Sequence, residues 1–297
     1  MPVFSQLRSF AGHIYHRLAD QAVLWGLVDP QRKVKKDLAG LAETNPQIAT
    51  AIIDAVGNKT SPEERRWVER IEELRRQMNA SSEELEMMDY GAGSSKSQLT
   101  QEEMYKGRVV HRTLGQICSV ASKSDRTELL LFRLMREIKP DNCIELGTSV
   151  GVSACYQSAA LKMNGSGKLV TMEGADSVAS VAARNFATLG LDNVELVRGR
   201  FQDTLADVLR ANPLVDYAFI DGHHDGPATV RYFNEIAPAL APAAVLMFDD
   251  IRWSEGMTRA WDEIRKDPRV RVSVDLGCMG LIWTGDGRSA LHFNTKF

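Results

Sequence analysis

The sequence has few cysteines and no long apolar run. The first shortage argues against a protein held by disulfides or zinc, and the second argues against a membrane-spanning protein. Only four of its 297 residues are cysteines, and no two of them form a C-x-x-C pair. Such usage is typical of a reduced, cytoplasmic protein without a disulfide framework or a zinc site. Charged residues interrupt every apolar stretch near the N-terminus, and no later stretch approaches the length of a membrane span. We therefore expect a cytoplasmic protein with no signal peptide and no membrane segment.

A strong positive charge is also lacking. The formal net charge is -3 and the sequence pI is about 6.1. Polyanions are attracted by an extended positive field, which this composition does not supply. We therefore do not expect nucleic acid as an obligate partner.

The first third of the chain has the pattern of a helical region, residues 1–90. Apolar side chains recur at helical spacing from Phe4 to Leu18. Ser61 is followed by Pro62 and, three residues on, by Glu64, which predicts a helix start with a capping box. Residues 91–109 begin with a Gly- and Ser-rich run, so they are expected to form either a linker or a lid near a binding site.

From residue 142 onward, short apolar runs alternate with helical patterns. The strand-like runs are 143–146, 169–172, 194–197, 217–220 and 244–248. Five β-then-α units predict a parallel sheet covered by helices on both faces. Residues 270–274 and 279–283 have no helix between them and predict an antiparallel hairpin, after which 291–297 could add an edge strand. We expect residues 110–297 to form an α/β, Rossmann-like domain with a seven-stranded, mostly parallel sheet.

Ligands of open α/β sheets bind beyond the carboxyl ends of the strands, so the residues that follow each strand are the candidates. After the first strand stands an E-x-G-x-x-x-G pattern formed by Glu145, Gly147 and Gly151. It is neither the G-x-G-x-x-G of a dinucleotide site nor a P-loop. An acid on the strand disfavours phosphates and suits a ligand with an ammonium group. The alternative is a turn whose glycines serve packing alone.

The next two strand ends offer groups for a nucleoside. Glu173 ends the second strand, where a carboxylate can accept both hydroxyls of an unphosphorylated ribose. After the third strand, Phe201 offers an aromatic face, and Gln202 and Asp203 offer polar edges that suit adenine. The alternative for the last two is that they only start the following helix.

Three aspartates follow the fourth and fifth strands, namely Asp221, Asp249 and Asp250. Their mutual repulsion requires compensation, which a divalent cation with oxygen ligands could provide. Alternatively, Asp221 holds the ammonium group of the ligand and either Asp249 or Asp250 caps a helix. His223 and His224 are candidates for a general base, or else an exposed pair that opens a helix.

These residues together make the chain from about residue 110 resemble the class I S-adenosylmethionine-dependent methyltransferases, and more narrowly their catechol and caffeoyl-CoA O-methyltransferase-like group. The resemblance implies that S-adenosylmethionine is the cofactor, that Ser153 faces its methionine carboxylate and that Glu173 binds its ribose. It implies a metal site for Mg²⁺ or another divalent cation at Asp221, Asp249 and Asp250. The cofactor-binding set that it implies is Glu145, Gly147, Thr148, Gly151, Ser153, Glu173, Phe201, Gln202, Asp203 and Asp221.

Two features depart from that group. The lysine usual three residues after the first metal-ligand aspartate is His224 here, which leaves the identity of the base open. The helical N-terminal region is also longer than the short catechol-type enzymes have. The segment from Asp89 to Ser94 resembles one that precedes the catalytic domain of bacterial relatives, and we expect it to act as a lid.

The expected reaction is methylation of a hydroxyl of a small molecule, with Asp221 and a divalent ion orienting the acceptor and His223 or His224 taking the proton. The alternatives are S- or N-methylation of a small amino-acid-like acceptor without metal, and an inactive, cofactor-binding interaction protein. A nicotinamide-dependent dehydrogenase is disfavoured by Glu145 and by the missing third glycine. The resemblance also implies a homodimer.

Overall fold

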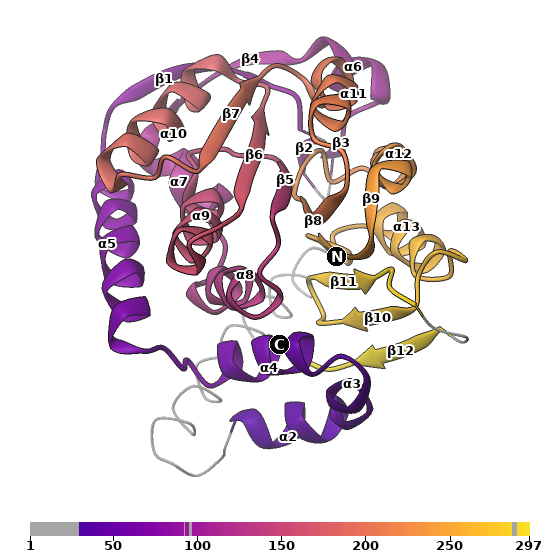
Figure 1. Ribbon diagram of the computed structural model, residues 1–297. Coiled ribbons are helices and arrows are strands. Elements are labelled where there is room, and N and C mark those ends of the chain that lie inside the picture. Colours follow the sequence, from indigo (N-terminus) through magenta and orange to yellow (C-terminus); the bar gives the residue numbers. More distant parts are fainter. Residues whose placement is uncertain (1–29, 92, 95–96, 287–289) are drawn as a thin grey trace, which may run out of the picture.

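Residues 142–294, about the C-terminal half of the chain, contain the eight strands of one sheet in the computed structural model (Figure 1). The structure describes residues 30–91, 93–94, 97–286 and 290–297. The strand order in the sheet is β12-β10-β11-β9-β8-β5-β6-β7. These strands are β5 (Asn142–Leu146), β6 (Lys168–Glu173), β7 (Val194–Arg198), β8 (Val215–Ile220), β9 (Leu240–Phe248), β10 (Val272–Asp275), β11 (Gly280–Trp283) and β12 (Leu291–Asn294).

The predicted α/β architecture and its C-terminal hairpin are confirmed. Strands β5 to β9 pair in parallel, and β11 is antiparallel to both β9 and β10. Helices connect the parallel strands, and none of the described helices could cross a membrane, because none is both long and apolar enough. The helices of this part are α8 (Asp125–Ile138), α9 (Val152–Asn164), α10 (Asp176–Leu189), α11 (Phe201–Ala211), α12 (Gly226–Ile236) and α13 (Glu255–Ile264), with a 3-10 turn, η1 (Ala237–Ala239).

The sheet has one strand more than the seven predicted. The eighth, β12, pairs in parallel with β10 at the edge of the sheet. Among its four residues only Phe293 packs against the core, and the other three are exposed. So short an edge strand has too few inward positions to give a clear alternating pattern in the sequence.

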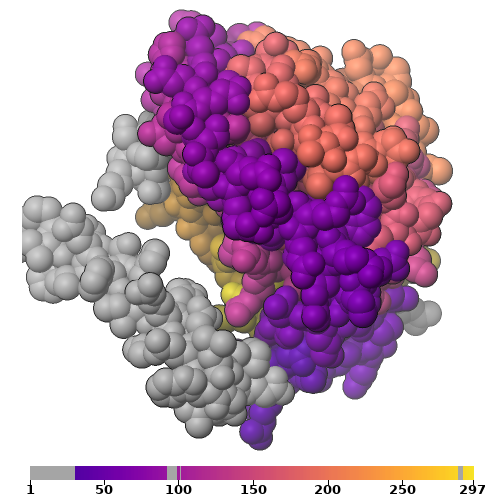
Figure 2. All heavy atoms as spheres, turned by 90° about the vertical axis from the view of Figure 1, so that its left-hand side faces the viewer, coloured from indigo at the N-terminus to yellow at the C-terminus, as the bar shows by residue number. Residues whose placement is uncertain are grey.

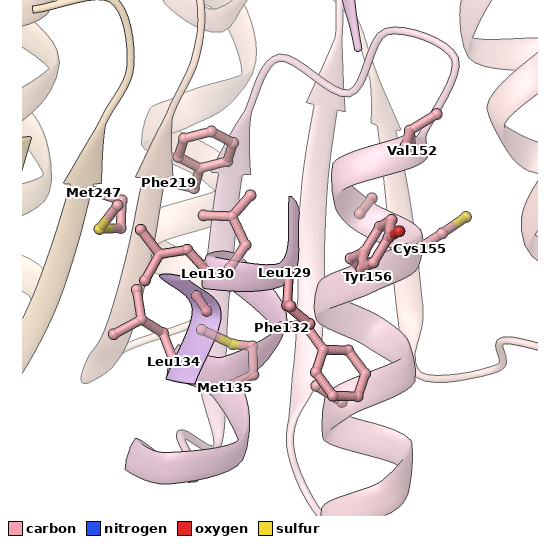
Figure 3. Packing of buried hydrophobic residues seen from close by; sticks show 14 of the residues in the cluster. Leu129, Leu130, Phe132, Leu134, Met135, Val152, Cys155, Tyr156, Phe219 and Met247 are labelled. Atoms are coloured by element: carbon pink, nitrogen blue, oxygen red, sulfur yellow. The ribbon is translucent and has the colours of Figure 1, made fainter. Parts of the chain in front are cut away.

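Alternate residues of the central strands enter two hydrophobic cores on opposite faces of the sheet. Tyr217 and Phe219 belong to one core, whereas Ala218 and Ile220 belong to the other. Figure 3 shows the first core, where the buried face of α8, including Leu130 and Leu134, meets α9 and the side chains of Phe219 and Met247. This period-two division is what a strand buried on both faces requires, and it fixes which residues reach the carboxyl edge.

The N-terminal helices add a further layer on the α8–α9 side. The layer contains α2 (Pro30–Asp37), α3 (Ala39–Thr44), α4 (Pro46–Val56) and α5 (Pro62–Asn79). Both halves of the predicted capping box of Ser61 and Glu64 are present at the start of α5. Arg133 of α8 donates to Glu64 at 2.8 Å and to Asp54 at 3.1 Å. Figure 2 shows the indigo segment spread over the body of the molecule, and its apolar residues share one core with α8 and α9. The predicted helical face from Phe4 to Leu18 lies outside the described residues.

The helical prediction for residues 1–90 is wrong at its end. Residues Glu84–Asp89 form a strand, β1, which pairs antiparallel with β4 (Arg108–Thr113). Between them lie the two-residue strands β2 (Gly93–Ser94) and β3 (Ser97–Gln98) and the helix α6 (Gln101–Lys106). Glutamate and methionine favour helices intrinsically, but pairing with β4 overrides that preference. We call residues 84–113 the β1–β4 ribbon.

Candidate active site

The turn between β5 and α9 brings the backbone of Gly147 close to the backbone of Asp221. Gly147 has φ +106°, and a Cβ on it would lie 2.1 Å from the carbonyl oxygen of Asp221. Gly151 has φ +86° and packs on Phe186, so that its role in this structure is to seat the turn on α10. Gly147 and Ser149 line an open cavity of about 420 Å³ at the carboxyl edge of the sheet, which is the principal cavity of the candidate site. Thr148 is buried, and its hydroxyl is bonded to Thr171 at 2.6 Å.

Replacing Gly147 with alanine should lower the free energy of unfolding by about 3 kcal/mol or more, because backbone strain and overlap with Asp221 add. Gly165→Ala is the matched control, since Gly165 also has positive φ but has nothing within 4 Å of a built Cβ. The control should lose only about 1 kcal/mol. Urea denaturation of both variants measures the difference, and equal losses would show that the close approach is not the cause.

Glu145 lies beneath this turn rather than in the cavity. Its carboxylate is fully buried and accepts hydrogen bonds from Ser153 Oγ at 2.7 Å, Gln157 Nε2 at 2.7 Å and Thr171 Oγ1 at 2.6 Å. Burial raises the pKa of Glu145 to about 7, while these three donors favour its ionised form. In this structure Glu145 therefore ties β5, β6 and α9 together. Neither it nor Ser153 lines the cavity.

Glu173, at the end of β6, does face the cavity. Its carboxylate accepts hydrogen bonds from the backbone N–H groups of Ser149 and Ala175, both at 2.8 Å. Burial raises the pKa of Glu173, and these backbone donors oppose the rise. The carboxylate is thus held against the glycine turn, where the sequence analysis expected an acceptor for ribose hydroxyls.

The residues after β7 divide between two cavities. Phe201 lines the principal cavity, and Gln202 lines a smaller one of about 200 Å³. The Nε2 atom of Gln202 is buried and finds no hydrogen-bond acceptor in the described part of the chain. Asp203 lines neither cavity and pairs with Arg200 at 2.6 Å.

Asp221 and Asp249 meet at the ends of β8 and β9, because the strand pairing continues into their loops. The Asp221 N–H donates to Leu146 O at 2.9 Å, and the Asp249 N–H donates to Ile220 O at 3.0 Å. The ammonium of Lys123 lies between the two carboxylates, 3.0 Å from Asp221 Oδ1 and bonded also to Asp249 Oδ2. Burial alone would lower the pKa of Lys123, but these two carboxylates raise it above its ordinary value. Burial raises the pKa of Asp221, and Lys123 opposes that rise.

The two histidines take different positions. His223 Nδ1 is bonded to the Tyr232 hydroxyl, and its ring stacks on Tyr232 and meets Phe201 edge to face. Burial lowers the pKa of His223 to about 4. His224 lies between two acids, with Nε2 3.8 Å from Asp221 Oδ1 and Nδ1 3.5 Å from Asp250 Oδ2. Burial lowers its pKa also, although Asp250 and Asp249 oppose the shift, so the His224 ring is neutral at neutral pH.

A divalent ion does not fit this arrangement as it stands. Ligand atoms of Asp221, His224 and Asp249 lie within 4.8 Å of one another, which would suit a small ion. Asp250, the third ligand that the sequence implied, is not part of that group and lies beside His224 instead. The Lys123 ammonium already bridges Asp221 and Asp249, so a second cation would be repelled unless Lys123 left.

These side chains surround one open cavity of about 420 Å³ at the carboxyl edge of the sheet. Residues 87–91 of the β1–β4 ribbon line it, and the lid role expected of the segment from Asp89 to Ser94 stays a prediction. Sequence reasoning missed Lys123, because it belongs to the connector between α7 (Leu114–Ala121) and α8 and follows no strand. The lining residues are Met87, Met88, Asp89, Tyr90, Gly91, Val120, Ala121, Lys123, Gly147, Ser149, Glu173, Gly174, Arg200, Phe201, Asp221, Gly222, His223, His224, Asp250 and Trp253.

Comparison with known proteins adds a family and a fold. Residues 144–251 match the family described as "Methyltransferase domain". The S-adenosylhomocysteine-bound methyltransferase PaMTH1 of Podospora anserina is 18% identical, with a TM-score of 0.50 over 57% of this chain and 82% of that chain. An O-methyltransferase of Bacillus cereus, in complex with S-adenosylhomocysteine, is 25% identical, with a TM-score of 0.47 over 55% of this chain and 81% of that chain. No curated protein matched the sequence. Residues 144–251 thus match a methyltransferase domain, and the chain shares its fold with a solved methyltransferase structure.

Proposed function

We propose that the chain transfers a methyl group from S-adenosylmethionine to a hydroxyl of a small molecule. One observation carries this proposal. Two groups of residues line a single cavity. The first wall contains Ser149 and Glu173, which suit a nucleoside, and the second wall contains the ionisable side chains of Lys123, Asp221 and His224. A methyltransferase must hold its donor and its acceptor side by side in this manner.

The first wall fits the cofactor. Glu173 presents a carboxylate fixed by two backbone donors, and a carboxylate so placed can accept the ribose hydroxyls. Phe201, which lines the same cavity, offers an aromatic face to adenine. When bound, S-adenosylmethionine supplies a methyl group on a sulfonium centre, which is the group transferred.

The second wall can accept a proton from the acceptor and stabilise charge on its oxygen. His224 is neutral at neutral pH, so it can take a proton from an acceptor hydroxyl. Lys123 can donate a hydrogen bond to the acceptor oxygen, and Asp221 holds Lys123 by a hydrogen bond and lies 3.8 Å from His224 Nε2. His223 is a weaker candidate for the base, because its Nδ1 atom is engaged with the Tyr232 hydroxyl.

The cavity sets the size and polarity of the acceptor. A volume of about 420 Å³ lies within the range of small-molecule sites. Its rim is apolar where Val120, Met88 and Trp253 line it, and the Val120 side chain is 74% exposed there. We therefore expect an acceptor with an apolar body and at least one hydroxyl.

The amino-acid-like acceptor expected as the alternative is favoured by one feature, the carboxylate of Asp250 at the cavity wall, which could bind an ammonium group. Magnesium assistance, also expected from the sequence, would require Lys123 to leave Asp221 and Asp249, and we assign it no step. Assembly as a homodimer and a cytoplasmic location stay predictions from the sequence.

Transfer of a radiolabelled methyl group from S-adenosylmethionine to a panel of small hydroxyl, amine and thioether compounds tests the proposal. We expect labelling of hydroxyl compounds, at a rate that falls in acid. Labelling of thioethers at a rate independent of pH would favour the alternative. Cofactor binding without transfer to any compound would contradict the proposed activity and favour an interaction protein.

A further inference from the structure

The strongest feature that the proposed function leaves unexplained is the position of Lys123. Its ammonium bridges the carboxylates of Asp221 and Asp249, which end neighbouring strands of the sheet. The Asp249 side chain is 3% exposed and the Lys123 side chain 18%. A lysine at the surface would extend into water, whereas this one is directed into an acidic site at the base of a cavity.

The backbone of Lys123 is clamped on both sides. Its N–H donates to Glu128 Oε1 at 3.2 Å, and its carbonyl accepts a hydrogen bond from Arg75 Nη2 at 2.6 Å. The following residue, Ser124, is the N-cap of α8 and accepts from the Thr127 N–H. These contacts fix the point from which the side chain starts, so the ammonium is held in place by the fold on both flanks.

The charges of the neighbouring side chains explain why an ammonium group held at this position is stabilising. Two carboxylates at adjacent strand ends repel each other, and a cation between them removes the repulsion. The carboxyl group of Asp250 lies alongside, 3.5 Å from His224 Nδ1, and makes the site more acidic still. A divalent ion entering the same space would meet the ammonium at the oxygens that both require.

We propose that Lys123 is a built-in cation that occupies the place of a divalent metal, so that this enzyme positions its acceptor without a metal ion. An ammonium has three N–H donors. Asp221 and Asp249 accept two of them, which leaves a third for an acceptor oxygen in the cavity. An ammonium acts by hydrogen bonding and charge, and it does not generate a bound hydroxide as a metal can. The site therefore depends on a separate base, the role proposed for His224.

Binding of Mn²⁺ alone, followed by its electron paramagnetic resonance signal in the absence of cofactor and acceptor, tests this inference. Wild-type protein should leave the Mn²⁺ signal unchanged up to about 1 mM. Lys123→Met removes the charge but keeps the length of the side chain, and it should bind Mn²⁺ at least ~10-fold more tightly than wild type. Lys123→Arg keeps a cation and should behave as wild type.

Two further variants locate the effect. Lys162→Met removes a lysine that pairs with the exposed Asp192 and should not bind Mn²⁺. Combining Lys123→Met with Asp249→Asn should abolish the new binding. Sub-millimolar binding by the wild type, or equal affinities of wild type and Lys123→Met, would overturn the inference. If Lys123→Met fails to fold, Lys123→Gln removes the same charge with a side chain that can still form hydrogen bonds, and it takes the place of Lys123→Met in the titration.

The consequence for catalysis rests on the proposed function, but the metal titration does not. If methyl transfer is found, it should proceed at an unchanged rate in a chelator. If no transfer is found and Lys123→Met still gains Mn²⁺ binding, the proposed function fails while the assignment of Lys123 stands. A rate that rises with added Mg²⁺ in the wild type would contradict the assignment even where transfer is confirmed.

Discussion

Replacing Glu173 with alanine should weaken binding of S-adenosylhomocysteine by about 100-fold or more. The carboxylate is fixed in the cavity by the N–H groups of Ser149 and Ala175, and it faces the space assigned to the ribose. A hydrogen bond to a charged group contributes about 1.5–3 kcal/mol, and two ribose hydroxyls can donate to Glu173. The loss of both bonds gives the expected factor, which calorimetric titration measures.

The control for this variant is Glu195→Ala, which removes an exposed glutamate of the adjacent strand β7. Its affinity should stay within about twofold of wild type. Glu173→Gln keeps one carbonyl acceptor and should fall between the two variants. Wild-type affinity in Glu173→Ala, with an unchanged melting temperature, would place the cofactor elsewhere in the molecule.

Replacing His224 with alanine should lower kcat by about 10²–10³-fold while cofactor affinity stays within about threefold. A positioned general base contributes about 10²–10⁴ in rate, and His224 lies in the cavity between Asp221 and Asp250. The control is His292→Ala, because His292 lies on the edge strand β12 and is bonded to Ser273, outside the cavity. If kcat of His224→Ala decreased by less than about threefold, His224 would be excluded as the base.

The dependence of the wild-type kcat on pH also tests whether His224 is the base. Burial lowers the pKa of His224 below its ordinary value of 6.5, so the unprotonated base predominates at pH 7. The kcat should therefore be nearly constant at neutral pH and fall as the pH drops below about 6.5. A rate that begins to fall above pH 7 as the pH is lowered would indicate a group whose pKa is raised, contrary to this assignment.

Local patterns were sufficient to predict the sheet and the turn after β5. Short continuous apolar runs predicted β8 and β9, whose residues are divided between the two cores, and the positive φ of Gly147 and Gly151 explains why glycine stands at both positions. Glu173 could also be placed, because the parallel pairing of β5 with β6 brings their carboxyl ends to one edge. These features depend on residues close in sequence or on a regular ladder.

Features that depend on distant parts of the chain could not be predicted in this way. Lys123 precedes Asp221 by 98 residues, and only the tertiary fold brings the two side chains together. β1 has residues that favour a helix, and only its pairing with β4 makes it a strand. Three donors, among them Thr171 of the neighbouring strand, surround the carboxylate of Glu145 beneath the turn, and the expected contact of Glu145 with the cofactor stays a prediction. In each case the partner that decides the outcome lies outside the local pattern.

Calorimetric titration of the wild-type protein with S-adenosylhomocysteine, in the presence and in the absence of magnesium, tests the central claim most directly. The claim is that the cavity at the carboxyl edge of the sheet binds this cofactor and that Lys123 supplies the cation there. We expect micromolar affinity that is the same in both conditions. Absence of binding in both conditions would contradict the cofactor assignment, and binding that requires magnesium would contradict the role of Lys123.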